Sequence, residues 1–67
     1  MDEFFRIWVK VKRVYGLERT VRKSLDQFEM RIYRDRKLII KEIDETEELM
    51  YYNALLALLR YVRSHDC

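Results

Sequence analysis

Residues able to carry covalent chemistry are few in this 67-residue chain. Ser24 and Ser64 supply the serine hydroxyls, and His65 is the only imidazole that could serve as their base. Nucleophilic catalysis needs a nucleophile, a base and an orienting group in a fixed geometry. Adjacency in sequence does not supply that geometry, so we interpret His65 as a solvated residue at a helix end.

Metal chemistry has equally little support. One acidic segment could offer carboxylate ligands: Asp44, Glu45, Glu47 and Glu48. Because this segment precedes an apolar run, its charges are better explained as partners of the positive end of a helix dipole. One cysteine, Cys67, and one histidine can form neither an internal disulfide nor a structural zinc site. We therefore expect no catalytic activity, no metal and no cofactor.

Positive charge is concentrated in the first two thirds of the chain. Residues 1–43 carry twelve Lys/Arg and seven Asp/Glu, a net charge of +5, whereas residues 44–67 carry two and five, a net charge of −3. Such a segment could bind the phosphates of RNA or DNA, with Phe5, Trp8, Tyr15 and Tyr33 available for base stacking. The alternative is that the charges solvate an exposed face while the aromatic rings pack in the core. The candidate RNA contacts are Lys10, Lys12, Arg31, Arg34, Arg36 and Lys37.

The length predicts a single domain over residues 1–67, near the lower limit for a self-sufficient core. Domains this small are commonly stabilised by disulfides, a metal or a partner, so association with another chain is expected. The lone cysteine and the absence of a signal peptide favour the cytoplasm. An apolar run over 49–62 is too short to span a bilayer and contains Arg60, so no membrane contact is expected.

The first half of the chain predicts a strand followed by a helix. Apolar and charged residues alternate over 5–12, and the β-branched side chains there favour a strand. After Gly16, apolar residues follow at spacings of four, four and three, which predicts a short amphipathic helix over 17–28. A rival interpretation is one continuous helix over 3–34 in a coiled coil, because the apolar spacing there is also close to a heptad.

The second half predicts a hairpin and a long helix. Strands at 28–34 and 37–43 are expected to join through a turn at Asp35 and Arg36. A helix over 44–63 follows, with Asp44 and Glu47 as its capping pair. The resulting order, β-α-β-β-α, predicts an α+β fold with a three-stranded antiparallel sheet and two helices on one face.

The last predicted helix is apolar almost all round, which requires burial on more than one side. Two stripes can be distinguished by helical spacing. One contains Tyr52, Leu55, Leu59 and Val62, with Leu56 beside it; the other contains Met50, Ala54, Leu58 and Tyr61, with Ala57 beside it. One stripe is expected to pack on the chain's own sheet and the other on a partner helix, and the sequence does not tell which.

The predicted element order, a basic hairpin leading into an acidic cap, and a helix ending in Leu59, Arg60 and Tyr61 together resemble one family. It is the small dimerising subunit of the archaeal and eukaryotic KEOPS complex, which makes threonylcarbamoyladenosine in tRNA. The resemblance covers about residues 4–64. Ala54 and Leu55 also fall where that family has small and apolar residues.

The resemblance implies a non-catalytic subunit that pairs its sheet with a second copy or a paralogue, docks helices of the catalytic subunit and supports tRNA binding. The partner-helix interface is then expected at Met50, Tyr51, Ala54, Leu55, Leu58, Leu59, Tyr61 and Val62. Two alternatives remain open from the residues alone. One is a small basic nucleic-acid-binding regulator, and the other is a helical coiled-coil adaptor.

Overall fold

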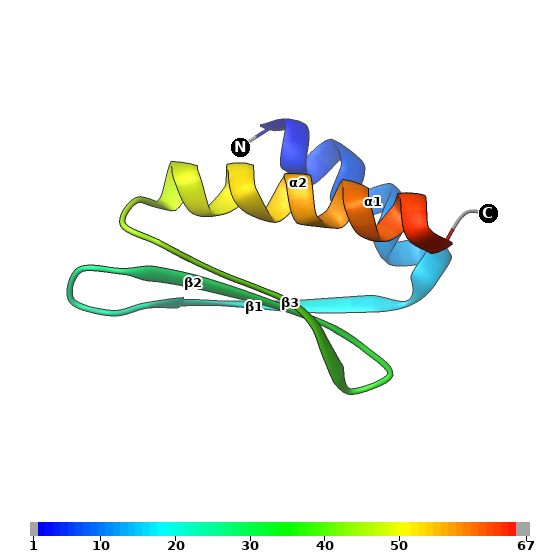
Figure 1. Cartoon of the computed structure of the whole chain (residues 1–67), viewed down its shortest axis with the longest axis horizontal. Coiled ribbons are helices and arrows are strands. Elements are labelled where there is room, and N and C mark those ends of the chain that lie inside the picture. The colour runs from blue at the N-terminus through cyan, green and yellow to red at the C-terminus, as the bar shows by residue number, and fades with distance from the viewer. Residues whose placement is uncertain (1, 66–67) are drawn as a thin grey trace.

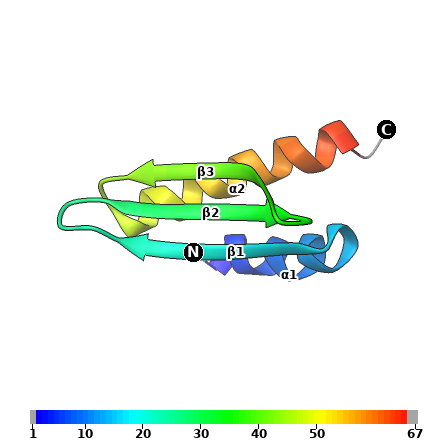
Figure 2. The ribbon, with the colours of Figure 1, turned by 90° about the horizontal axis from the view of Figure 1, so that it is seen from below.

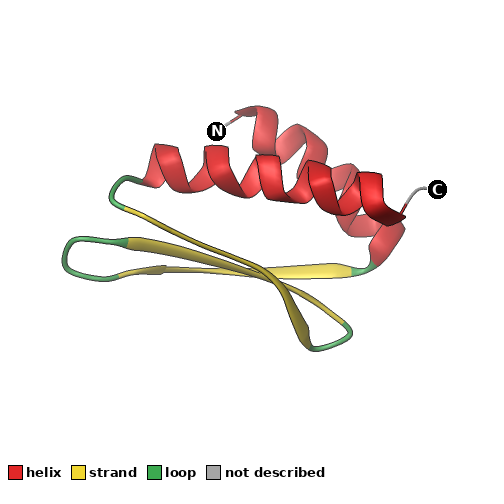
Figure 3. Cartoon of the chain, in the orientation of Figure 1, coloured by secondary structure: helices red, strands yellow, loops and turns green. Residues whose placement is uncertain are grey.

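The computed structural model describes residues 2–65 and contains two helices lying side by side on one face of a three-stranded antiparallel sheet (Figures 1 and 3). The strand order is β1-β2-β3, so β2 is central and β1 and β3 form the two edges (Figure 2). The elements are α1 (Asp2–Tyr15), β1 (Leu17–Lys23), β2 (Phe28–Arg34), β3 (Lys37–Asp44) and α2 (Glu47–His65). The predicted α+β class and sheet are therefore confirmed, but the order is α-β-β-β-α.

The predicted strand over 5–12 is wrong, because this segment belongs to α1. Its buried residues Phe4, Trp8 and Val11 lie four and three apart, which is the spacing of one helix face. Asp2 and Glu3 in the first turn complement the helix dipole. The β-branched side chains reduce helix propensity by only a few tenths of a kcal/mol each, so this tertiary packing overrides them.

The predicted helix over 17–28 is also wrong, and so is the continuous helix over 3–34. Gly16, at φ +66°, ends α1 in the left-handed conformation that glycine adopts without strain. The seven residues of β1 then pair antiparallel with β2, from Leu17 opposite Arg34 to Lys23 opposite Phe28. Leu25, expected on the helix face, lies fully exposed in the connecting loop.

The predicted hairpin is confirmed. Asp35 and Arg36 connect β2 to β3 with φ angles of 52° and 67°, the pair of positive values that defines a type I′ turn. Beyond the turn, Tyr33 pairs with Leu38 and Ile32 with Ile40, which leaves Ile39 as one extra residue in β3. This bulge increases the local twist of the edge strand.

The long terminal helix is confirmed, with a later start than expected. The backbone N–H of Leu49 donates to Thr46 Oγ1 at 3.1 Å, so Thr46 is the N-cap and Glu47 the first helical residue. Asp44, the predicted cap, instead accepts a hydrogen bond from the Asn53 side chain at 3.1 Å. That bond fixes the end of β3 against the second turn of α2.

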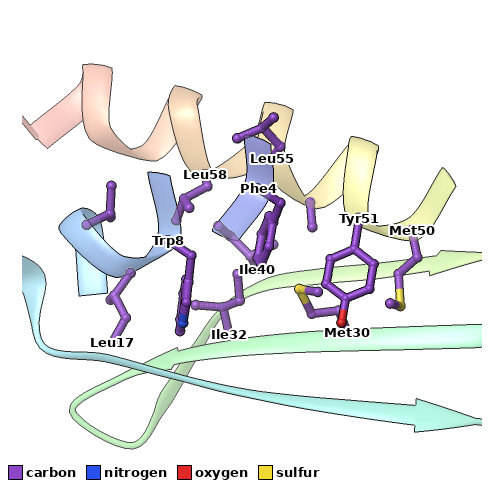
Figure 4. Close-up of a cluster of buried hydrophobic side chains, with 12 residues drawn as sticks. Phe4, Trp8, Leu17, Met30, Ile32, Ile40, Met50, Tyr51, Leu55 and Leu58 are labelled. Carbon is purple, nitrogen blue, oxygen red and sulfur yellow. The ribbon is translucent and has the colours of Figure 1, made fainter. Parts of the chain in front are cut away.

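The core lies between the helix layer and the sheet (Figure 4). Met30 and Ile32 of β2 are completely buried beneath the two helices, as is Leu17 at the start of β1. The side chains of Phe4 and Trp8 are stacked with ring centroids 5.9 Å apart. The core residues are Phe4, Trp8, Val11, Leu17, Met30, Ile32, Ile40, Met50, Tyr51, Ala54, Leu55 and Leu58. Neither described helix has the length and hydropathy needed to cross a membrane.

Candidate interaction surface

Helix α2 has two apolar faces, and the structure assigns one of them to the chain's own core. Met50, Ala54 and Leu58 are 0% exposed and face the sheet. Tyr51 and Leu55, on the side toward α1, are also buried. The stripe of Met50, Ala54 and Leu58 is therefore the one that packs on the sheet, a choice that the sequence left open.

This placement divides the predicted partner interface. Five of its eight residues lie in the core, so they are covered by the chain itself: Met50, Tyr51, Ala54, Leu55 and Leu58. Tyr61 and Val62 are partly buried against the core, and Leu59 is exposed.

The opposite face of α2 carries four large apolar side chains that the chain does not cover. Leu49, Tyr52, Leu56 and Leu59 are 49%, 58%, 37% and 39% exposed, and we call them the outer stripe. Their spacings of three, four and three residues place them in one row along the helix, about half a turn away from the buried row. The same spacing is that of the seam of a coiled coil.

A shallow hollow lies along the C-terminal half of the outer stripe. Its lining consists of three aliphatic and two basic residues, Leu56, Leu59, Val62, Arg60 and Arg63. A smaller hollow lies near the other end of the stripe, between the N-terminal turns of the two helices. Its lining includes the carboxylates of Glu3 and Glu48 beside the Tyr52 ring. The stripe is therefore acidic at one end and basic at the other.

Two arginines hold the helix layer to the sheet. Arg19 of β1 lies 5.0 Å from the Phe5 ring centroid and 5.5 Å from that of Trp8, within the range of cation–π attraction. Arg34 of β2 donates to the Tyr61 hydroxyl at 2.7 Å, and this hydrogen bond raises the pKa of Arg34. These contacts fix the orientation of both helices and so define which face of α2 is exposed.

The candidate RNA contacts do not form one patch. Lys10 and Lys12 are exposed on α1, whereas Arg36 and Lys37 are exposed at the β2–β3 turn. Arg34 points toward the helices and is held by Tyr61. Arg31 lies on the open face of the sheet, where its Nε is 3.0 Å from Glu29 Oε1. Of the rings predicted to stack on bases, Trp8 is in the core, and Phe5 and Tyr15 pack against the core.

The one serine–histidine contact is part of the end of α2. Ser64 Oγ lies 3.0 Å from His65 Nδ1, but the same hydroxyl donates to the Tyr61 carbonyl oxygen at 3.0 Å. His65 Nδ1 lies 2.9 Å from that same oxygen. Both side chains thus contact the Tyr61 carbonyl oxygen in the last turns of the helix, as serine side chains commonly do with a carbonyl three or four residues back. Within residues 2–65 no three His, Cys, Asp or Glu side chains are gathered so that they could hold a metal ion.

Comparison with known proteins finds no matching family model, no matching curated protein and no matching solved structure. The resemblance to the KEOPS subunit included an initial strand, and α1 occupies that position instead. Leu49, Tyr52 and Leu56 were absent from the predicted interface, although their heptad-like spacing with Leu59 is visible in the sequence. That spacing is the signal by which these three residues can be found, but it is hard to recognise in a helix that is apolar almost all round.

Proposed function

We propose that this chain is a non-catalytic interaction subunit that binds a partner helix along the outer stripe of α2. The observation that carries the proposal is the row of four large apolar side chains exposed on a helix whose other face is already committed to the core. Exposed apolar rows of this kind mark sites of protein–protein contact, because water-exposed apolar surface otherwise favours aggregation. Amphipathic helices commonly bind such rows through side chains spaced three and four residues apart.

The resemblance in sequence suggests that this subunit belongs to a tRNA threonylcarbamoylation complex. The ending Leu59, Arg60 and Tyr61 still supports it, whereas the element order no longer does. In that setting the outer stripe would contact helices of the catalytic subunit, and the protein would act in the cytoplasm. Sheet pairing between two copies is the other arrangement that the resemblance implies.

The decisive experiment compares the proteins that co-purify with three tagged chains expressed in the cells of origin. Leu56→Glu places a charge in the middle of the outer stripe, and Val14→Glu places the same charge on α1, where Val14 is 75% exposed. We expect stoichiometric partners of the parent to be retained by Val14→Glu and lost by Leu56→Glu. Circular dichroism of each purified variant checks that both remain folded.

If Leu56→Glu retains every partner at the level of the parent, the outer stripe is not a docking surface. Recovery of the threonylcarbamoylating catalytic subunit, dependent on Leu56, would support the KEOPS-like assignment specifically. A titration with tRNA at two salt concentrations tests the nucleic-acid alternative, since phosphate binding weakens steeply as salt rises. We expect weak binding, because the basic side chains are dispersed over three surfaces.

A further inference from the structure

We propose that the helix bound by the outer stripe is α2 of a second copy of this chain, packed antiparallel about a two-fold axis. This inference rests on the proposed function that the outer stripe binds a helix, and it names a second copy as the partner in place of the catalytic subunit of the KEOPS-like setting. The surface is Leu49, Tyr52, Leu56 and Leu59 together with the charged residues at the two ends of the helix layer.

The spacing of the outer stripe is self-complementary. Intervals of three, four and three residues read the same from either end of α2. In an antiparallel pair, Leu49 therefore meets Leu59 of the second copy, and Tyr52 meets Leu56. All four layers are apolar, and each contact occurs twice, as a two-fold interface requires. The 19 residues of α2 extend over about 28 Å, so the four layers fit within one helix–helix contact.

The charges favour the antiparallel orientation. Helices α1 and α2 run in the same direction, because Phe4 contacts Tyr51 near one end and Tyr15 contacts Tyr61 near the other (Figure 1). Both helices begin with acidic residues and end with basic ones. The helix layer is therefore acidic at one end and basic at the other. The acidic residues are Asp2, Glu3, Glu47 and Glu48, and the basic ones are Lys12, Arg13, Arg60 and Arg63.

A two-fold axis across the middle of this layer places the acidic end of each copy against the basic end of the other. Parallel packing would instead bring like charges together at both ends, which is unfavourable for partly desolvated groups. The apolar spacing is compatible with both orientations, and charge complementarity selects the antiparallel one.

The sheet offers a less suitable surface for self-association. On its open face, Glu29 lies between Arg31, at 3.0 Å, and Lys41, at 3.9 Å. This ion-pair network separates the exposed apolar side chains Leu38 and Ile43 of that face, so they do not form a continuous row. The edge strand β1 carries charged residues, which oppose strand addition, at Glu18, Arg19, Arg22 and Lys23. The bulge at Ile39 interrupts the other edge.

The first test is the molar mass of the purified chain in solution as a function of concentration. A single helix–helix contact lies at the small end of specific interfaces, so a reversible dimer of about micromolar affinity is expected. Leu56→Glu and Tyr52→Glu should each weaken the dimer by at least about tenfold, since each buries a carboxylate among apolar side chains. Val14→Glu, on α1, should leave it unchanged.

The second test establishes orientation by disulfide cross-linking in a Cys67→Ser background. Antiparallel packing predicts that Leu49→Cys and Leu59→Cys cross-link when the two variants are mixed, and that neither cross-links efficiently alone. Val14→Cys reports the level of random collision. Cross-linking of each variant with itself would show parallel packing and overturn the inference.

A chain that stays monomeric at high concentration would also overturn it, as would a dimer that Leu56→Glu leaves intact, which would point to the sheets. In either case the proposed function stands if Leu56→Glu still loses a different protein in the co-purification. If that binding is unaffected as well, both proposals fail.

Discussion

Two neighbouring leucines of α2 should respond to the same mutation to different extents. Leu58 is 0% exposed and packs in the core, whereas Leu59 is 39% exposed and belongs to the outer stripe. We therefore compare Leu58→Ala with Leu59→Ala, measured at a concentration where the parent is monomeric. Dilution is needed because association would otherwise add to the apparent stability.

The magnitudes follow from burial. Leu58→Ala removes a fully buried side chain and leaves a cavity, which costs about 3 kcal/mol of unfolding free energy. Leu59→Ala removes three carbons worth about 2.4 kcal/mol if fully buried, and the exposed fraction reduces this to about 1.5 kcal/mol without a closed cavity. A chain of this size has roughly 3–10 kcal/mol in total, so Leu58→Ala removes a large share.

Thermal unfolding by circular dichroism measures the difference. About 1.5 kcal/mol corresponds to a separation of roughly 6–12 °C in Tm for a domain of this length. At higher concentration the dimer affinity can be measured for both variants. Here Leu59→Ala should have the larger effect and weaken the dimer, whereas Leu58→Ala should leave the affinity of the folded chain unchanged. Equal losses of stability, or a larger loss for Leu59→Ala, would mean that α2 is rotated from the orientation described, and the outer stripe would lose its basis.

Backbone conformation and titration provide two further predictions. Arg36, at φ 67°, occupies a left-handed position of the type I′ turn, so Arg36→Gly should stabilise the chain by about 1 kcal/mol. Gly16 has φ 66° and open space around an added methyl group, so Gly16→Ala should destabilise the chain by about 1 kcal/mol through backbone strain alone. Chemical denaturation measures both changes, and the same sign for both would refute the conformational argument. Burial raises the pKa of Glu42 above its ordinary 4.5, with Asp44 adding to the shift and Arg60 opposing it. The folded state therefore binds the Glu42 proton more tightly than the unfolded state does. The contribution of Glu42 to stability should increase as the pH falls from neutral toward the raised pKa. Glu42→Gln should stabilise the chain at pH 7 and remove this part of the pH dependence; an unchanged pH profile would contradict it.

The sequence predicted the second half of the fold and misassigned the first half, for a physical reason. Segment 5–12 satisfies two periods at once, since its odd-numbered residues alternate as in a strand while Phe4, Trp8 and Val11 follow a helix face. Phe4, Trp8 and Val11 are buried, whereas Val9 of the alternating set is 53% exposed. Local propensity favours a strand in this segment, but packing of Phe4, Trp8 and Val11 in the core stabilises the helix instead.

The second misassignment has the same origin. Residues 17, 21, 25 and 28 match helical spacing, yet Leu25 is in a loop and Val21 is largely exposed. The β2 strand has two edges, and burial of Met30 and Ile32 requires a neighbour on each side as well as helices above. β1 supplies that second neighbour. This requirement is set by the tertiary structure and is not visible in the spacing of residues 17–28.

The orientation of α2 shows why core and interface could not be separated from sequence alone. Both faces of the helix contain leucine and tyrosine, and alanine and methionine on the buried face are apolar as well, so hydropathy does not show which face packs on the sheet. The sheet is what distinguishes them: Ala54 and Leu58 are buried in the same core cluster as Ile32 and Ile40 of the sheet, and the row on the other side remains uncovered. Because one face of α2 packs on the chain's own sheet, the position of its second apolar face is fixed on the helix layer. That position, with opposite charges at the two ends, is what makes the outer stripe suited to a second copy of the same layer.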